Sequence, residues 1–362
     1  MMSSKTWIVS ILTMCLAIFI LMGSVVYIYD PYCYYRIPSD RLIVNNYRFL
    51  NAGLIKNVNY DTAIIGSSMV QNFDMKLFRE KLHMSPIKLT VGALSIEGVD
   101  VIYSAVKRKG SARNIIFCID IPSLNKEEDA LKVYPLYLYD DDPSNDFRYL
   151  YGYETWMRLL PLNLFFSLLE KSGKKLPQFY GTHDIDDIGA WDKDALYGEQ
   201  YVLRDYQNNL NQISEQNLHD IDARMKKNAD KLIEILLNVG VVENEKMSYI
   251  FFFPPYSALM WSQAIRSGYF RPFQSAKQYV VDRLDGRQNV SIFDFQILPE
   301  IMDLNNYKDT THYSAKINDL MIEHMANGTM KVDRDTIDDN INQLMIMVRS
   351  FDVYLHSKFV VQ

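Results

Sequence analysis

Five short apolar runs separated by helical patterns constrain the fold of this 362-residue chain more than any other feature. Each run is apolar throughout rather than alternating, which is typical of strands in a sheet that is covered on both faces and is therefore usually parallel. Strand, helix and strand in this order predict a doubly wound α/β sandwich. The predicted strands are 62–66 (TAIIG), 87–91 (IKLTV), 114–119 (NIIFCI), 248–253 (SYIFFF) and 290–295 (VSIFDF).

Helical patterns connect these runs. Asp74 is placed as the N-cap of the first of them, because its short carboxylate accepts hydrogen bonds from the first free N–H groups of a helix. Residues 125–205 interrupt the alternation, are rich in Tyr, Asp and Leu, and are interpreted as an insertion that caps one end of the sheet. The predicted helices are 74–83, 97–108, a stretch around 153–171 inside the insertion, 206–238, 258–284, one that begins near Ser314, and one after about residue 330.

The first thirty residues are predicted to lie outside the globular fold. Trp7–Tyr29 carries no charge, and its length of about 34 Å as a helix is enough to cross a bilayer. Lys5 before the run and Asp30 after it favour an inside N-terminus. A cleaved signal peptide is the alternative, but the run is long for its apolar region and lacks an Ala-x-Ala site. We therefore expect a retained single-pass anchor, with the chain from about residue 31 outside the cytoplasm.

The predicted organisation follows from these patterns. The chain is expected to comprise an N-terminal transmembrane anchor (1–30), a juxtamembrane segment (31–60), an α/β domain (61–330) with the insertion 125–205, and a C-terminal helical tail (331–362).

Composition excludes several classes of function. The net charge of -6 gives no basic footprint for nucleic acid. Six scattered histidines show no metal-ligand spacing, and no glycine-rich phosphate loop follows any strand, so neither a metal nor a cofactor is expected. Three cysteines do not indicate a disulfide framework, although a bridge between Cys33 and Cys118 is an alternative. The 25 tyrosines suit contact with sugars or peptides, or plain core packing.

A candidate nucleophile follows the first strand, where Gly66 precedes Ser67 and Ser68. In an open α/β sheet, ligands sit at the carboxyl ends of the strands. A serine hydroxyl needs a base to take its proton, and the base needs a partner that fixes its tautomer. After the last strand, Asp309 and His312 are three residues apart, a spacing that places both side chains on the same side of a turn. A simple small-residue turn and a helix-capping histidine are the alternative interpretations.

The joint arrangement resembles the SGNH (GDSL-like) hydrolase superfamily. In that superfamily the serine follows the first strand in a Gly-Asp-Ser motif and the base comes from a C-terminal Asp-x-x-His. The chain looks more closely like the membrane-anchored SGNH-like proteins of bacterial cell-surface acylation, such as the D-alanylation protein of lipoteichoic acid synthesis and the alginate acetylation proteins. The resemblance implies a flavodoxin-like three-layer sandwich over roughly 60–325.

Site roles are carried over from the resemblance. Ser68 matches the nucleophile, with Ser67 in the place of the motif's aspartate. His312 matches the base and Asp309 the group that orients it. Gly92, after the second strand, is the candidate for the backbone donor that completes an oxyanion hole with Ser68, with a plain turn glycine as the alternative.

The sequence departs from the family pattern after the third strand. The family's Gly-x-Asn-Asp block is absent, and IDIPSLN stands in its place. Asn125 is the candidate for the missing amide, although its spacing differs, and Asp120 is interpreted as a capping or site residue.

Other residues are assigned to the substrate cleft or to the core. Tyr256 and Ser257 end the fourth strand and are predicted to line the cleft. Trp191 is placed either as a stacking platform for a sugar or as a buried anchor of the cap. Asp294, inside the fifth run, is expected to be hydrogen-bonded rather than catalytic.

The function expected from the sequence is that of an extracytoplasmic O-acyltransferase or esterase. It acts on O-acyl groups, expected to be acetyl, of a cell-envelope polysaccharide, and transfer and hydrolysis share its chemistry as far as the acyl-enzyme. By resemblance, a multispanning membrane acyltransferase is the expected acyl donor. The alternative is a non-catalytic SGNH-like module that binds the polymer or scaffolds an acylation complex.

Overall fold

The computed structural model describes residues 3–37, 46–126, 133–156, 184–209, 218–237 and 247–360. The chain divides into two compact units. The first, here called the N-terminal unit, comprises Met1–Val58 and Val133–Ile185, and the second, here called the α/β unit, comprises Asn59–Lys132 and Asp186–Gln362.

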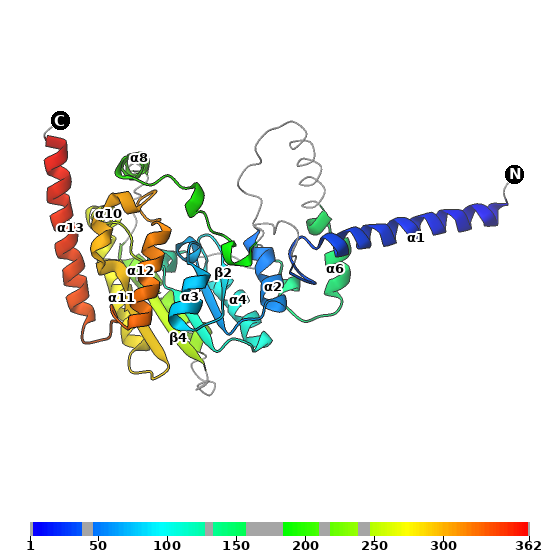
Figure 1. Cartoon of the computed structure of the whole chain (residues 1–362), viewed down its shortest axis with the longest axis horizontal. Coiled ribbons are helices and arrows are strands. Elements are labelled where there is room, and N and C mark those ends of the chain that lie inside the picture. Colours follow the sequence, from blue (N-terminus) through cyan, green and yellow to red (C-terminus); the bar gives the residue numbers. More distant parts are fainter. Residues whose placement is uncertain are drawn as a thin grey trace. The chain divides into compact units, whose positions relative to one another are not determined.

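The α/β unit is built on a parallel five-stranded sheet, which confirms the predicted fold class (Figure 1). The strand order is β2-β1-β3-β4-β5. Each strand lies within one residue of its predicted position and is almost wholly buried, because apolar side chains project from both of its faces. The strands are β1 Thr62–Gly66, β2 Pro86–Thr90, β3 Asn114–Cys118, β4 Ser248–Phe253 and β5 Val290–Asp294.

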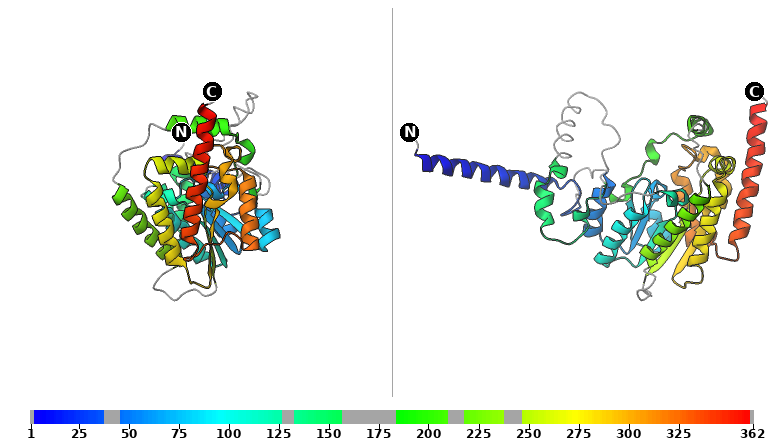
Figure 2. Two further views of the ribbon diagram at one scale, coloured as in Figure 1. Left: turned by 90° about the vertical axis from the view of Figure 1, so that its left-hand side faces the viewer. Right: turned by 180° about the vertical axis from the view of Figure 1, so that it is seen from behind.

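Helices cover both faces of the sheet. Helices α9 and α11 lie side by side on one face, and α3 and α12 lie on the other (Figure 2). The helices of this unit are α3 Met75–Leu82, α4 Ile96–Lys109, α8 Glu199–Asn209, α9 Leu218–Leu237, α10 Ala258–Arg266, α11 Phe270–Leu284, α12 Ala315–Asn327 and α13 Ile337–Val360. Short 3-10 helices include η1 Ser68–Val70, η2 Ile121–Asn125, η6 Asp192–Asp194, η8 Phe295–Ile297, η9 Pro299–Met302 and η10 Leu304–Asn306.

Two of the predicted helices differ from the structure. The single helix expected over 258–284 is wrong, because the chain turns between α10 and α11 at Gly268, whose φ of 81° lies in the left-handed region that ends helices. The helix expected over 206–238 corresponds to the end of α8 and to α9, and residues 210–217 between them lie outside the described residues.

The strand order places a topological switch point between β1 and β3. Helical connections leave neighbouring strands in opposite directions there, which opens a crevice at their carboxyl ends. Ile65 of β1 is level with Leu89 of β2 and Phe117 of β3, so the loops that follow these strands emerge at one edge. The loop after β1 carries Ser67 and Ser68.

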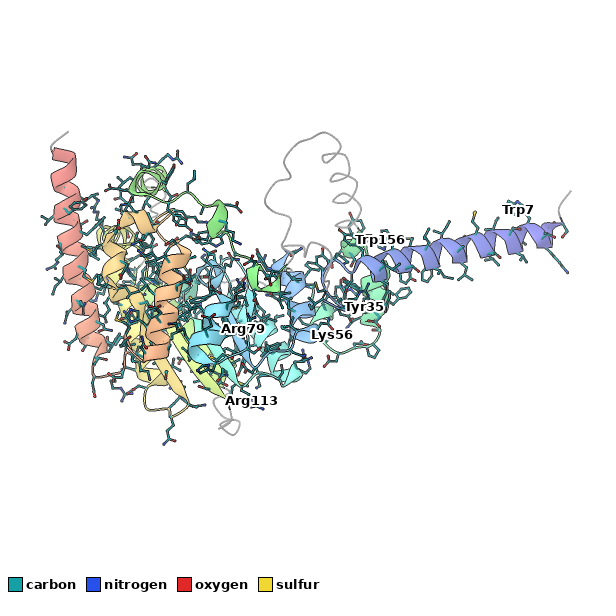
Figure 3. The ribbon with its side chains drawn as sticks, viewed as in Figure 1. Trp7, Tyr35, Lys56, Arg79, Arg113 and Trp156 are labelled. Carbon is teal, nitrogen blue, oxygen red and sulfur yellow. The ribbon has the colours of Figure 1, made fainter. Side chains whose placement is uncertain are left out.

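The N-terminal unit holds the apolar helix α1 (Ser4–Tyr29), with α2 (Tyr47–Asn57), η3 (Leu136–Leu138) and α6 (Asn145–Tyr151). Helix α1 is long and apolar enough to cross a membrane, a test that a signal sequence also passes. Its side chains project outward, as Trp7 does near the N-terminus (Figure 3). Most of the helix predicted around 153–171 lies outside the described residues.

Helix α1 ends on a buried aspartate. Asp30 adopts a left-handed conformation as the C-cap. Its carboxylate accepts hydrogen bonds from the backbone N–H groups of Tyr34, Tyr35 and Arg36 and from the Tyr149 hydroxyl. The chain is therefore fixed where it leaves the helix.

Candidate active site

Ser68 stands on a tight strand-to-helix turn. Gly66 ends β1, and a Cβ atom there would lie 2.9 Å from both Cys118 and Val70, so the close approach of β1 to β3 requires glycine. Ser67 is extended, and Ser68 begins η1 with its side chain partly exposed. The turn therefore presents the Ser68 hydroxyl at the carboxyl edge of the sheet.

His312 reaches the Ser68 hydroxyl from the loop that follows β5. The distance from Ser68 Oγ to His312 Nε2 is 2.7 Å. The loop is closed by the bridge between Tyr307 and Tyr313. The Tyr313 hydroxyl also donates to the carbonyl of Met69 in η1 at 2.9 Å. Direct contacts thus fix the two loops relative to each other.

Asp309 holds the other ring nitrogen of His312. Its carboxylate oxygens lie 2.8 and 3.0 Å from His312 Nδ1. Burial opposes ionisation of Asp309, but hydrogen bonds from the His312 ring and from the N–H groups of Thr311 and His312 outweigh it, and the pKa falls to about 2. Asp309 is therefore a carboxylate at neutral pH and selects the tautomer in which Nδ1 carries the proton.

These distances satisfy what general-base activation of a serine requires. The base lies within hydrogen-bond reach of the hydroxyl, and a carboxylate orients the base. The three predicted residues, which lie 244 positions apart at their extremes, are thus brought together.

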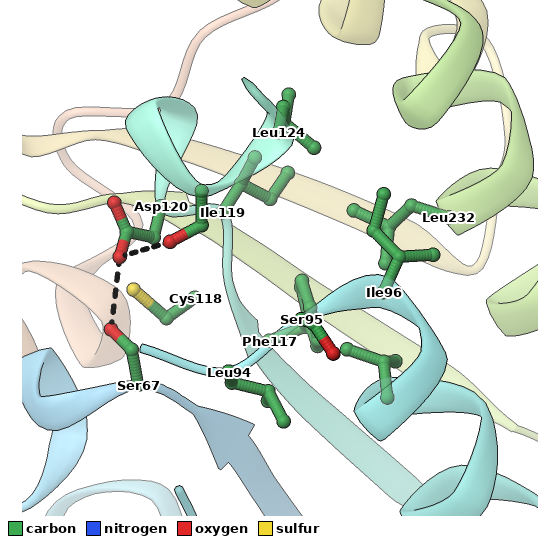
Figure 4. Close-up of a pocket in the computed structure, with 12 residues that line it drawn as sticks. Ser67, Leu94, Ser95, Ile96, Phe117, Cys118, Ile119, Asp120, Leu124 and Leu232 are labelled. Carbon is green, nitrogen blue, oxygen red and sulfur yellow. Dashed lines mark hydrogen bonds between the residues drawn. The ribbon is translucent and has the colours of Figure 1, made fainter. Parts of the chain in front are cut away.

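Ser67 makes a different set of contacts. Its hydroxyl donates to Asp120 Oδ2 at 3.2 Å, and Ser123 donates to the same oxygen at 2.8 Å (Figure 4). The hydroxyl of Tyr256 donates to the other oxygen of Asp120. Ser67 and Asp120 form the polar wall of a small pocket whose remaining walls are mostly apolar, including Leu94, Ile96, Phe117, Leu124 and Leu232.

The backbone N–H groups of Ser68 and Gly92 have no hydrogen-bond acceptor within the described part of the chain. Gly92 is exposed in the loop after β2. Ala93 follows it with a φ of 53°, a left-handed conformation that costs a residue with a Cβ on the order of 1 kcal/mol. Free backbone donors are what an oxyanion hole requires.

Asn125 lies at the end of η2 and contacts another element. Its side-chain oxygen accepts a hydrogen bond from Arg224 Nε of α9 at 2.8 Å. Its role as an oxyanion donor stays a prediction.

The other predicted cleft residues differ in their burial and in their distance from the reacting groups. Tyr256 and Ser257 are fully buried, and the Ser257 hydroxyl donates to the carbonyl of Thr310, which supports the loop that carries His312. Trp191 lies closer to the reacting groups, because its ring is 5.6 Å from the His312 ring, edge to face. Their contact with a substrate stays a prediction.

Three further polar residues support the site and were not found by the sequence interpretation. Lys88, buried in β2, donates from Nζ to the carbonyl of Gln71 just after η1. Asn72 accepts hydrogen bonds from the N–H groups of Trp191 and Asp192. Lys308 lies over the Trp191 ring. The sequence offered one signal for Lys88, which is a charged residue inside the apolar run of the second strand.

Metal ligands and disulfides are not found in the described residues. No three His, Cys, Asp or Glu side chains gather there as metal ligands. Cys33 and Cys118 are free thiols, so the alternative of a bridge between them is wrong.

Comparisons with known proteins do not assign this chain to a family. No protein-family model matches the sequence, and no curated protein matches it. Among solved structures, the crystal structure of a lipase from a goat rumen metagenome aligns with 74% of this chain and 97% of its own, at 8% identity and a TM-score of 0.38. So low a score carries no argument about function.

Proposed function

We propose that this protein is a membrane-anchored, extracytoplasmic serine enzyme that transfers or hydrolyses O-acyl groups of a cell-envelope polysaccharide. The observation that carries the proposal is the chain of hydrogen bonds from Ser68 Oγ to His312 Nε2, at 2.7 Å, and from His312 Nδ1 to Asp309, at 2.8 Å. Its site lies at the carboxyl edge of the sheet, where doubly wound folds bind their ligands.

The first half-reaction makes an acyl-enzyme. Ser68 Oγ attacks the carbonyl carbon of the acyl donor while its proton passes to His312 Nε2. The tetrahedral oxyanion accepts hydrogen bonds from the N–H groups of Ser68 and Gly92. The bond to the leaving group then breaks, and the leaving oxygen takes the proton from Nε2. Asp309 remains a carboxylate throughout and stabilises the imidazolium.

The second half-reaction returns the enzyme to its starting state. A hydroxyl of the acceptor, or water, gives its proton to His312 Nε2 and attacks the acyl carbonyl of Ser68. Collapse of the intermediate returns the proton to Ser68 Oγ and releases the new ester or the free acid. Exclusion of water from the site would favour transfer over hydrolysis.

The partners of the reaction follow from the same proposal. An anchor in α1 would tether the protein to the membrane, where a multispanning acyltransferase is expected to deliver the acyl group. The expected acyl group is acetyl. No cofactor or metal enters any step.

Acylation of Ser68 is the direct test. Full-length protein in a non-ionic detergent is exposed to 4-nitrophenyl acetate, and the intact mass and the modified peptide are recorded. We expect one acetyl group on Ser68, which Ser68→Ala and His312→Ala abolish. The matched control is Ser67→Ala, which removes the neighbouring hydroxyl and leaves the adduct in place.

A non-catalytic polymer-binding module is the second candidate. The observation that favours it is the absence of the family's Gly-x-Asn-Asp block after the third strand, where IDIPSLN stands instead. An unmodified Ser68 in wild-type protein, with the variants identical to it, would support this candidate and exclude the acyl-enzyme.

A further inference from the structure

Helix α6 packs against the C-terminal half of α1 within the N-terminal unit (Figure 1). The rings of Phe19 and Tyr151 are stacked with their centres 3.9 Å apart, and the Phe147 ring lies 6.0 Å from that of Phe19. A Cβ at Gly23 would overlap with the Tyr151 hydroxyl, so the glycine permits this close approach. These contacts fix α6 at a definite level along α1.

Two cations bracket the apolar part of α1. Lys5 lies in the first turn of the helix, and the Arg36 guanidinium donates to the carbonyls of Tyr27 and Ile28 at the other end, both at 2.7 Å. The helix rises about 34 Å between Lys5 and Ile28, compared with roughly 30 Å for the hydrocarbon core of a bilayer. A span that slid in either direction would draw a cation into the hydrocarbon, which is unfavourable.

The level of α6 therefore falls inside the bilayer when α1 spans it. Phe19 precedes Ile28 along the helix by about 13 Å, so its stack with Tyr151 lies well to the hydrocarbon side of the Arg36 contact. Helix α6 cannot stay in water at that level while it keeps its contacts with α1.

The exposed surface of α6 suits such a location. Phe147 is 61% exposed and continues the exposed apolar surface of α1 through Phe19. Its charged neighbours interact within the unit: the Arg148 guanidinium lies 4.1 Å from the centre of the Tyr137 ring, and Asp146 interacts with the Tyr34 hydroxyl. Lipid acyl chains would cover the ring of Phe147 without burying an unpaired charge.

We infer that α6 inserts Phe147 and Tyr151 among the acyl chains of the leaflet next to the C-terminal end of α1. The inference rests on the part of the proposed function that retains α1 as an anchor, and it is independent of the chemistry at Ser68. It adds that the N-terminal unit is embedded in one leaflet, rather than joined to the membrane by α1 alone.

Fluorescence quenching in vesicles tests the depth of α6. Full-length protein is labelled with monobromobimane and reconstituted in vesicles of phosphatidylcholine and phosphatidylglycerol, where doxyl-labelled phosphatidylcholine quenches from the acyl chains and iodide quenches from water. Cys15 is exposed on α1 and reports its insertion, whereas Cys33 and Cys118 are buried. In the Cys15→Ala background, Phe147→Cys reports α6.

A label at position 147 should lose most of its fluorescence to the doxyl lipid and little to iodide. The matched control is Val353→Cys, an exposed apolar position of the α/β unit, which should show the reverse. Quenching by iodide at position 147, or protection there from both quenchers as in a contact with another protein chain, overturns the inference. The label on Cys15 separates this failure from failure of α1 to insert, which would overturn both ideas. Acetylation of Ser68 is measured separately.

A substitution in α1 tests whether its contact with α6 sets this depth. Gly23→Leu places a side chain where the Tyr151 hydroxyl lies, so the label at position 147 should become more accessible to iodide while α1 stays inserted. Val25→Leu adds a similar apolar group at an exposed position of α1 and should leave the quenching unchanged. An identical response of the two variants would overturn the role of the contact.

Discussion

Ser67 and Ser68 are neighbours in the sequence, yet their hydroxyls lie in different hydrogen-bond networks. Ser68 faces His312 at 2.7 Å, whereas Ser67 faces Asp120 at 3.2 Å and is almost fully buried. The turn after Gly66 directs the two side chains apart. The sequence alone singles out Ser68 by motif matching, and the distances supply a physical reason for the choice.

Replacement of the orienting carboxylate should slow acylation without removing the nucleophile. In Asp309→Asn, the amide donates to Nδ1 and favours the tautomer whose Nε2 carries a proton and cannot accept one from Ser68. We expect the rate of Ser68 acetylation to fall by about three to four orders of magnitude, as in other Ser-His-Asp triads. Stopped-flow release of 4-nitrophenol measures it. A loss smaller than tenfold would contradict the role of Asp309.

The depressed pKa of Asp309 also predicts a pH-dependent stability. Its pKa falls from 3.8 to about 2 on folding, so the ionised carboxylate stabilises the folded state above pH 4, and the contribution disappears as the pH falls through 2. The shift corresponds to roughly 2 kcal/mol. The free energy of unfolding should therefore differ between wild type and Asp309→Asn at pH 6, and the difference should shrink below pH 4. A difference independent of pH would argue against this linkage.

At the scale of elements, the strands were the most predictable part of the fold. Continuous apolar runs bounded by polar and turn residues fix where each strand lies along the chain, and each observed strand lies within one residue of its predicted position. The break between α10 and α11 was missed because apolar residues continue on both sides of it, although the dipeptide Ser267-Gly268 and Pro272 in the first turn of α11 are sequence signals of a turn. Lys308 was not identified from the sequence because its place at the site is shown by its contact with Trp191, which is distant in the sequence.

The junction between β1 and η1 should depend on glycine for steric reasons. In Gly66→Ala, the new Cβ would lie 2.9 Å from Cys118 and Val70, and we expect a loss of about 1–3 kcal/mol of stability from overpacking. Urea unfolding measures the loss. Gly92→Ala is the matched control, because a Cβ added there would meet no atom within 4 Å and the N–H is retained. Equal stability of the two variants would refute the steric explanation.

Helix α11 is joined to β5 by a buried ion pair. Lys277 Nζ lies 2.5 Å from Asp294 Oδ2, and both side chains are inaccessible to solvent. Asp294 also accepts hydrogen bonds from Gln296 N–H and from the Asn340 side chain, which agrees with its expected hydrogen-bonded role. Burial lowers the pKa of Lys277, although Asp294 opposes the shift.

Removal of one partner should leave the other charge buried and uncompensated. We expect Lys277→Met to cost about 3–5 kcal/mol of unfolding free energy. The control is Lys231→Met, which breaks the exposed pair with Glu97 and should cost less than about 1 kcal/mol. Comparable losses of unfolding free energy in the two variants would show that the burial of the ion pair does not determine the loss.

At the scale of the whole molecule, the sequence order conceals which segments fold together. The N-terminal unit joins Met1–Val58 to Val133–Ile185, and one of its links is the hydrogen bond from the Tyr149 hydroxyl to Asp30. Hydrophobic periodicity identifies elements but not pairings between polar groups more than a hundred residues apart. The predicted boundaries of the anchor, the juxtamembrane segment, the insertion and the tail stay predictions.

Retention of α1 as an anchor is the prediction on which the location of the protein depends. The intact mass of protein purified from membranes should include residues 1–30, and the protein should stay in the membrane fraction after alkaline carbonate extraction. Leu16 and Ile20 are exposed on α1, and their joint replacement by Arg should release the protein, because each charge costs about 2.5–3.5 kcal/mol at the centre of a spanning helix.

A matched substitution outside α1 separates membrane insertion from general solubility. Val353 is equally apolar and exposed, but it lies on α13 of the α/β unit, so Val353→Arg should leave the protein in the membrane. A mature chain that begins near residue 31 would identify α1 as a signal sequence. The protein would then be secreted, and no anchor would hold it beside a membrane partner that delivers the acyl group.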